Sequence, residues 1–84
     1  MEYVIVSYKK SDKGLKKPEI VGRVFTNFDN LLTKLAKLVN WPKSEVRSLG
    51  EYSIMENRDY LNCDYLYGWL RKENYDKKIE GLAQ

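Results

Sequence analysis

The clearest periodic pattern in the chain lies near its middle and predicts an amphipathic helix. Its apolar positions recur at helical spacing and are Phe28, Leu31, Leu32, Leu35, Leu38 and Val39. This spacing places them along one face of an α-helix and leaves polar residues on the other. Thr26, with Asp29 three residues later, is typical of a capping box at the start. Pro42 indicates that the helix ends before it, because the residue that precedes a proline avoids the α region.

Two strands are predicted before this helix. Residues 3–8 read Tyr-Val-Ile-Val-Ser-Tyr and are apolar on both faces, as expected of a strand in the middle of a sheet. Residues 19–25 have strand character again, and the polar, lysine-rich residues 9–18 separate the two strands. The simplest arrangement is an antiparallel hairpin with a basic loop.

The pattern after the helix is less regular. Residues 42–49 are typical of a short second helix, because Pro42 suits a first turn and Gly50 suits a position just past the end. Residues 51–56 predict a strand with Tyr52 and Ile54 on one face.

Residues 60–70 fit two patterns. Large or apolar residues occupy alternate positions, as in a strand, but others share a broad helical face. Gly68 and the many aromatic residues favour the strand, since glycine weakens a helix and aromatics suit a sheet. Residues 72–84 are polar, and we expect a C-terminal tail with little regular structure.

These elements predict one α+β domain that spans residues 1–84, a length that suits a single domain. The element order is β-β-α-(α)-β-β. The expected fold is a small antiparallel sheet with one main amphipathic helix packed on one face.

Composition excludes much of the common enzyme chemistry. The chain has no histidine, which rules out Ser-His-Asp and Cys-His arrangements and any histidine metal site. The single cysteine, Cys63, can form neither an intramolecular disulfide nor an all-cysteine zinc site, and we expect it to be a small buried residue. No phosphate-binding glycine motif is present. We therefore expect no enzyme, no metal and no cofactor. The absence of a signal-peptide pattern and of a long apolar run predicts a cytoplasmic protein.

Charge is unevenly distributed along the chain. Residues 1–26 carry six Lys/Arg against three Asp/Glu, and residues 27–50 carry four against two. Residues 51–84 reverse the balance, with five against seven. Such asymmetry is informative about partners rather than about fold.

Aromatic and acidic residues are interleaved in the last part of the chain and indicate a protein-binding surface. Tyr and Trp most often anchor interfaces, and seven Tyr are more than a small core can easily bury with every hydroxyl satisfied. The carboxylates would suit a basic groove on a partner. The candidate residues are Tyr52, Glu56, Asp59, Tyr60, Asp64, Tyr65, Tyr67 and Trp69. Alternatively, Tyr65, Tyr67 and Trp69 are core residues of a strand and the acids are its solvated face.

Lysines in the first half indicate an alternative, nucleic-acid contact. The candidate residues are Lys9, Lys10, Lys13, Lys16, Lys17, Lys34 and Lys37. A loop of this content could follow a phosphate backbone, where each neutralised phosphate releases counterions. The simpler interpretation is that lysines keep an exposed hairpin soluble and block aggregation at its edge. The sequence lacks both an RNP-type aromatic signature and a helix-turn-helix pattern.

The favoured hypothesis is a small, non-catalytic protein-binding module, an inhibitor or modulator of a larger host protein. The alternative is a nucleic-acid-binding accessory protein, and an unpaired edge strand also allows a homodimer. The composition, rich in Lys, Asn and Tyr and free of His, is similar to that of small accessory proteins of bacteriophages and mobile elements of AT-rich bacteria. Anti-CRISPR and other anti-defence proteins are among these. The resemblance covers no motif, so it assigns no functional residue.

Overall fold

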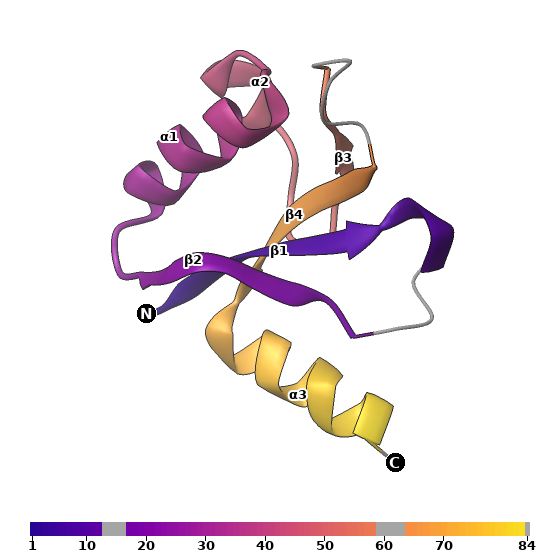
Figure 1. The fold of residues 1–84 in the computed structure, drawn as a ribbon. Helices are drawn as coiled ribbons and strands as arrows, with labels where there is room; N and C mark the ends of the chain where they lie inside the picture. The colour runs from indigo at the N-terminus through magenta and orange to yellow at the C-terminus, as the bar shows by residue number, and fades with distance from the viewer. Residues whose placement is uncertain (13–16, 59–63, 84) are drawn as a thin grey trace.

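The computed structural model describes residues 1–12, 17–58 and 64–83. Its elements follow one another along the chain as drawn in Figure 1, with strands β1 (Tyr3–Lys9), β2 (Glu19–Phe25), β3 (Met55–Glu56) and β4 (Tyr65–Arg71), helices α1 (Phe28–Val39), α2 (Lys43–Arg47) and α3 (Lys72–Ala83), and a short 3₁₀ turn, η1 (Lys10–Asp12). The described strands form one antiparallel sheet in the order β2-β1-β4-β3. The predicted α+β fold is confirmed.

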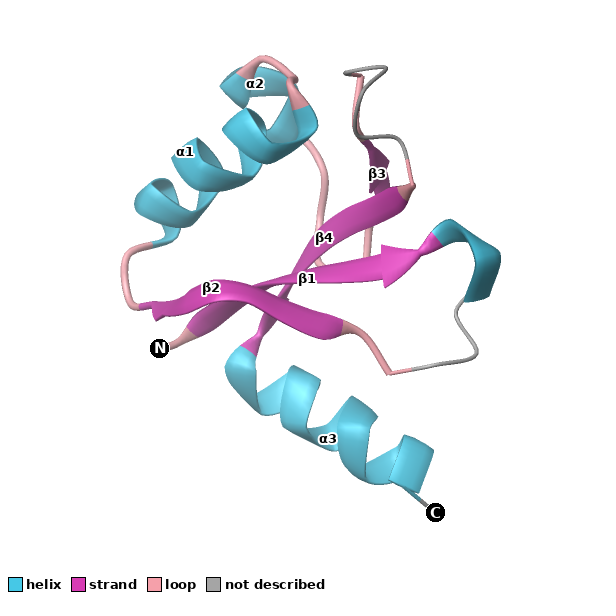
Figure 2. Ribbon diagram, in the orientation of Figure 1, coloured by secondary structure: helices cyan, strands magenta, loops and turns pink. Residues whose placement is uncertain are grey.

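Strand β1 occupies the middle of the sheet, as its apolar faces predicted. It pairs with β2 on one side and with β4 on the other (Figure 2). Val4, Ile5 and Val6 are almost completely buried. Because neighbouring residues of a strand point to opposite faces, this burial requires that both faces of the sheet are covered.

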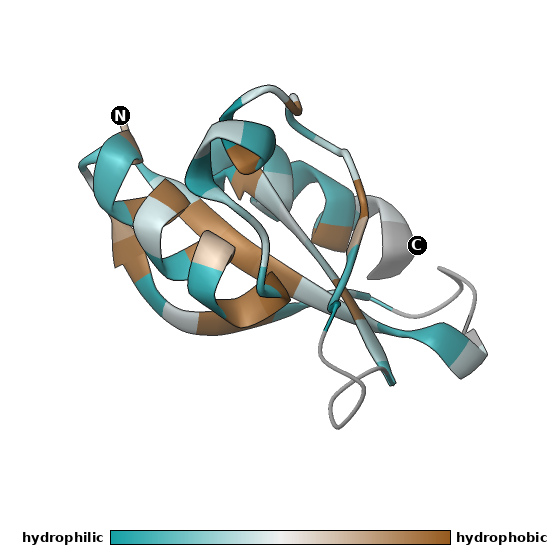
Figure 3. Cartoon of the chain, turned by 90° about the horizontal axis from the view of Figure 1, so that it is seen from above, coloured by the Kyte–Doolittle hydropathy of each residue, from teal (hydrophilic) through white to brown (hydrophobic). Residues whose placement is uncertain are grey.

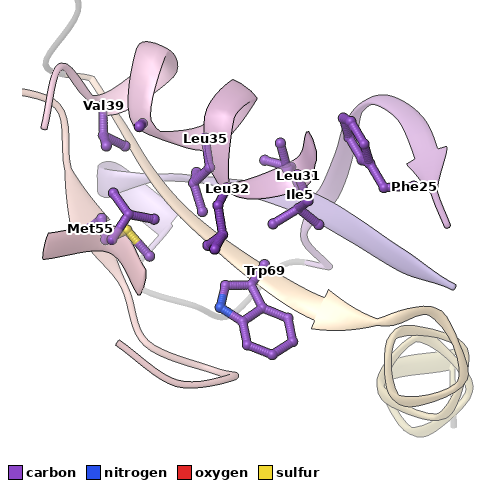
Figure 4. Packing of buried hydrophobic residues seen from close by; sticks show 10 residues of the cluster. Ile5, Phe25, Leu31, Leu32, Leu35, Val39, Met55 and Trp69 are labelled. Carbon is purple, nitrogen blue, oxygen red and sulfur yellow. The ribbon is translucent and has the colours of Figure 1, made fainter. Parts of the chain in front are cut away.

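Helix α1 covers the first face, and its apolar stripe forms the main core. Asn27 begins the helix, since its side chain accepts a hydrogen bond from the Asn30 N–H, so the predicted cap at Thr26 is wrong by one residue. Asn40 ends it in the left-handed conformation that helix C-termini favour. Figure 4 shows the stripe directed at the sheet and at β3; the labelled residues are Ile5, Phe25, Leu31, Leu32, Leu35, Val39, Met55 and Trp69.

Helix α3 covers part of the second face and corrects the prediction of a polar tail at residues 72–84. Tyr75 packs against Val4, Val6 and Leu70, and its hydroxyl donates a hydrogen bond to the Pro18 carbonyl at 3.2 Å. The sheet therefore lies between α1 and α3 instead of carrying a helix on one face only (Figure 1). In the view of Figure 3, hydrophobic and hydrophilic positions alternate on the helices, whereas the end of β1 is hydrophilic.

The predicted strand at residues 51–56 is reduced to β3, its last two residues. Tyr52 has a φ of 72°, which lies in the left-handed region and is incompatible with an extended ladder. The backbone instead leaves the regular ladder but stays against β4, since the Tyr52 N–H donates a hydrogen bond to the Trp69 carbonyl. In residues 60–70 the strand alternative is confirmed for the described part, which is β4.

Candidate binding surfaces

Some residues of the predicted aromatic and acidic surface are buried in the structure, and others are exposed. Trp69 is 8% exposed and lies in the main core, where it is not available to a partner. Tyr67 is half-buried against the same core. Tyr52, Glu56, Asp64 and Tyr65 are exposed. Asp59, Tyr60 and Cys63 lie outside the described residues.

Trp69 serves packing. Its ring meets Tyr3 at 6.0 Å and Phe28 at 4.8 Å between centroids, both in edge-on geometry. Its Nε1–H is buried without a hydrogen-bond partner in the described part of the chain. An unsatisfied donor of this kind costs about 1–3 kcal/mol, which the packing of this large ring must offset.

The exposed residues of the predicted surface also lie on opposite sides of the sheet. Residues directly opposite in an antiparallel ladder point to the same side. Tyr65 is opposite Lys9 and points to the α1 side, whereas Glu56 is opposite Leu66 and points to the α3 side. A single flat partner surface cannot contact both groups.

A smaller surface lies on the α3 side at the border of that helix, whose Lys78 ammonium is 5.7 Å from the centroid of the Tyr8 ring. We call Tyr8, Tyr52 and Ile54 the Tyr52 surface. Tyr8 is opposite Leu66 on this side, and its side chain is half-buried. Burial raises the pKa of Tyr8 above its ordinary value, and the neighbouring Tyr52 raises it further. Tyr52 and Ile54 are 56% and 57% exposed.

The backbone that carries Tyr52 is fixed on both sides. The carboxylate of Glu51, only 16% exposed, accepts hydrogen bonds from the Arg71 N–H and from the Asn74 Nδ2, each at 2.8 Å. Ser53 donates a hydrogen bond to the Gly50 carbonyl. Tyr52 and Ile54 are therefore presented by a rigid segment and not by a free loop.

We expect replacement of Glu51 by Ala to loosen this segment. Both hydrogen bonds disappear, and the positive end of α3 loses a nearby carboxylate. The free energy of unfolding should fall by about 1–2 kcal/mol, measured by urea denaturation. Glu73→Ala is the control, because Glu73 is exposed in the first turn of the same helix; its loss should be about 0.5 kcal/mol. Equal losses would contradict the anchoring role of Glu51.

A second surface is a basic groove between the edge strand β2 and helix α1. It has a volume of about 430 Å³ and is lined by Val21, Gly22, Arg23, Phe25, Asn30, Thr33, Lys34 and Lys37. None of these described lining residues is acidic. Lys34 and Lys37 were predicted as candidates, but Arg23 was missed, because only the path of β2 brings it opposite α1.

Other basic residues of this part of the fold are neutralised by ion pairs. Lys43 and Arg47 both contact Asp29, at 2.8 and 2.7 Å. The hydrogen bond from Lys43, together with both positive charges, lowers the pKa of the Asp29 carboxyl. Arg58 pairs with Glu45 and lies over the Trp41 ring. The groove cations form no such pair with a described residue.

The predicted basic loop is only partly described. Lys10 forms an ion pair with Glu56 at 3.4 Å, while Lys9 and Lys17 are exposed. Lys13 and Lys16 lie outside the described residues. The loop lysines that are described do not line the groove.

Neither a protein-family model, nor a curated protein, nor a solved structure matches this chain. Within the described ranges, no three His, Cys, Asp or Glu side chains are grouped closely enough to hold a metal ion. The helices seen in residues 28–47 and 72–83 are too short or too polar to cross a membrane.

Proposed function

We propose that this protein is a binding module that contacts another protein through the Tyr52 surface. The observation that carries the proposal is the conformation of Tyr52, an exposed aromatic residue at a φ of 72°. Among the described non-glycine residues, only Asn40 shares a positive φ, and Asn40 ends a helix, where this conformation is ordinary.

A tyrosine in this conformation is difficult to explain by folding alone. The left-handed region costs a residue with a Cβ about 1–2 kcal/mol, and glycine adopts it without that cost. The ring of Tyr52 is more than half exposed, so its burial offsets little of the strain. Strained residues of this type cluster at binding sites, and tyrosine is enriched among the residues that dominate binding energy.

The contact should depend more on apolar burial than on charge. Of the predicted carboxylates, Glu56 is next to the Tyr52 surface, but it forms an ion pair with Lys10. Tyr52 and Ile54 supply the anchors, and the mode of action we propose is steric, by occupying a site on a larger protein. Inhibition or modulation of a host protein is the form of this activity that the sequence hypothesis favours.

We expect Tyr52→Gly to separate binding from stability. Glycine removes the strain, so the free energy of unfolding should not fall and should rise by up to about 1 kcal/mol. Loss of the ring should weaken partner binding by about 2 kcal/mol, or roughly 30-fold. Tyr65→Ala is the matched control, because it removes an exposed tyrosine from the other side of the sheet; binding should be unchanged.

The partner can be sought with a photo-crosslinking amino acid at position 54 in cells that produce the protein. A protein that crosslinks from position 54 and is lost in Tyr52→Gly supports the proposal. A crosslinker at Glu80, exposed on α3, is the positional control. Crosslinking to a second copy of the chain would identify a homodimer. Unchanged crosslinking in Tyr52→Gly would remove the Tyr52 surface from consideration.

A further inference from the structure

We infer that the basic groove binds an acidic polypeptide segment in an extended conformation. The groove is a different surface from the Tyr52 surface, so the inference goes beyond the proposed function. It assigns this protein a second contact, with a partner chain rich in Asp or Glu.

The charge of the groove is the first argument. Arg23, Lys34 and Lys37 converge on it from two elements, and each is exposed. Nearby Lys43 and Arg47 are neutralised by Asp29, whereas the three groove cations form no ion pair with a described residue. Charge complementarity of this kind steers a partner and selects an anionic one. The exposed carboxylate of Glu19 lies farther along β2 and is not part of the lining.

The position of the groove beside an edge strand is the second argument. Strand β2 pairs with β1 only, so its outer backbone edge has no strand partner in the described sheet, and its residues Val21, Gly22 and Arg23 line the groove. An extended peptide can add to such an edge while its alternate side chains enter the adjoining groove. Gly22, with a φ of 75°, lies in a bulge where the β1–β2 register shifts. A bulge interrupts a regular ladder, so the edge suits a short segment and not a long strand.

The lining favours a polypeptide over nucleic acid. Phe25, the aromatic residue of the groove, is buried and lies under the guanidinium of Arg23, 5.3 Å from its centroid. It is therefore not available as a platform on which bases stack. Val21, which is only partly buried, offers an apolar contact for an alternate apolar side chain of a peptide.

The test is fluorescence anisotropy with a labelled peptide of eight residues that alternates Glu and Val, titrated with the full chain at about 50 mM salt. A peptide with Gln at each Glu position is the neutral probe, and single-stranded DNA of equal charge is the nucleic-acid probe. Lys37→Glu should weaken binding of the acidic peptide by about tenfold. Lys77→Glu changes the charge equally on α3, outside the groove, and should change binding less than about twofold.

Binding of the acidic peptide that depends on Lys37 and exceeds binding of the neutral peptide supports the inference. DNA binding that is tighter than peptide binding and is lost in Lys37→Glu would assign the groove to nucleic acid and overturn it. Equal binding of the neutral peptide, or no binding at about 1 mM protein, would overturn it as well. Tyr52→Gly should leave peptide binding unchanged, so failure here is distinguishable from failure of the proposed function.

Discussion

Replacement of Gly68 by Ala should destabilise the protein strongly, although it adds one methyl group. Gly68 is buried in β4 opposite Val6, and a Cβ at this position would lie 2.5 Å from the backbone oxygen of Ser53. The neighbour is backbone and cannot rotate away, so the segment that carries Tyr52 must shift. We expect a loss of about 3 kcal/mol of unfolding free energy, which lowers the melting temperature by about 10 °C or more.

Gly50→Ala is the matched control. No heavy atom outside its immediate neighbours lies within 4 Å of a Cβ at Gly50, so its melting temperature should change by no more than about 3 °C. If Gly68→Ala unfolds at the temperature of Gly50→Ala, the Ser53 carbonyl does not lie against Gly68 as described. Partner crosslinking from position 54 should also fall in Gly68→Ala, because the displaced segment is the one that presents Tyr52.

The elements that sequence predicted well are those whose residues decide their own conformation. Helix α1 carries its full apolar stripe, and Asn40 and Pro42 stop it locally. The hairpin of β1 and β2 follows from β-branched residues on each side of a polar loop. The central place of β1 was predictable because Val4 and Ile5 face opposite sides and both are apolar. In each case the signal is contained within about a dozen residues.

The elements that sequence misjudged depend on contacts between distant residues. Alternation in residues 51–56 predicted a strand, but Glu51 is held by the Arg71 N–H at the end of β4 and by Asn74 of α3, and the chain turns at Tyr52. Gly68 was interpreted as a reason against a helix, whereas its structural role is to leave room for the Ser53 carbonyl. Neither fact can be obtained from local propensity, because each partner lies 15 or more residues away in the chain.

Helix α3 had a weak signal that composition concealed. Tyr75 and Ile79 are four residues apart, as are Lys72 and Asp76, which form an ion pair at 2.7 Å. These spacings are typical of a helix, but the segment is polar on average and was interpreted as a tail. Its packing on Val4, Val6 and Leu70 gives it a stability that its own sequence does not indicate.

For the candidate surfaces, too, local sequence predicted some features, and others depend on contacts between distant residues. Lys34 and Lys37 were identified because lysines on the polar face of a helix are exposed, but the groove needed β2 to bring Arg23 beside them. Trp69 was proposed as an anchor from its residue type, and burial under α1 removes it. Residue type therefore predicted which chemistry is present, while only the sheet topology decides which side chains reach a partner together.

Leu35→Ala should cause a second large loss, and the result would test the main core. Leu35 lies at the centre of the α1 stripe and is fully buried (Figure 4). Removing a buried leucine side chain costs about 2–5 kcal/mol, from lost burial and from the cavity that remains. A domain of this size has a total stability of about 5–10 kcal/mol, so urea denaturation should show an early midpoint with an unchanged slope.

Leu38→Ala is the control on the same helix. Leu38 is only partly buried at the margin of the core, so its loss should be about 1 kcal/mol. If Leu35→Ala and Leu38→Ala lost similar amounts of unfolding free energy, α1 would not present the stripe of Leu31, Leu35 and Val39 to the sheet. A helix α1 that was rotated about its axis in this way would carry Lys34 and Lys37 away from β2. The measurement therefore also tests the geometry on which the basic groove depends.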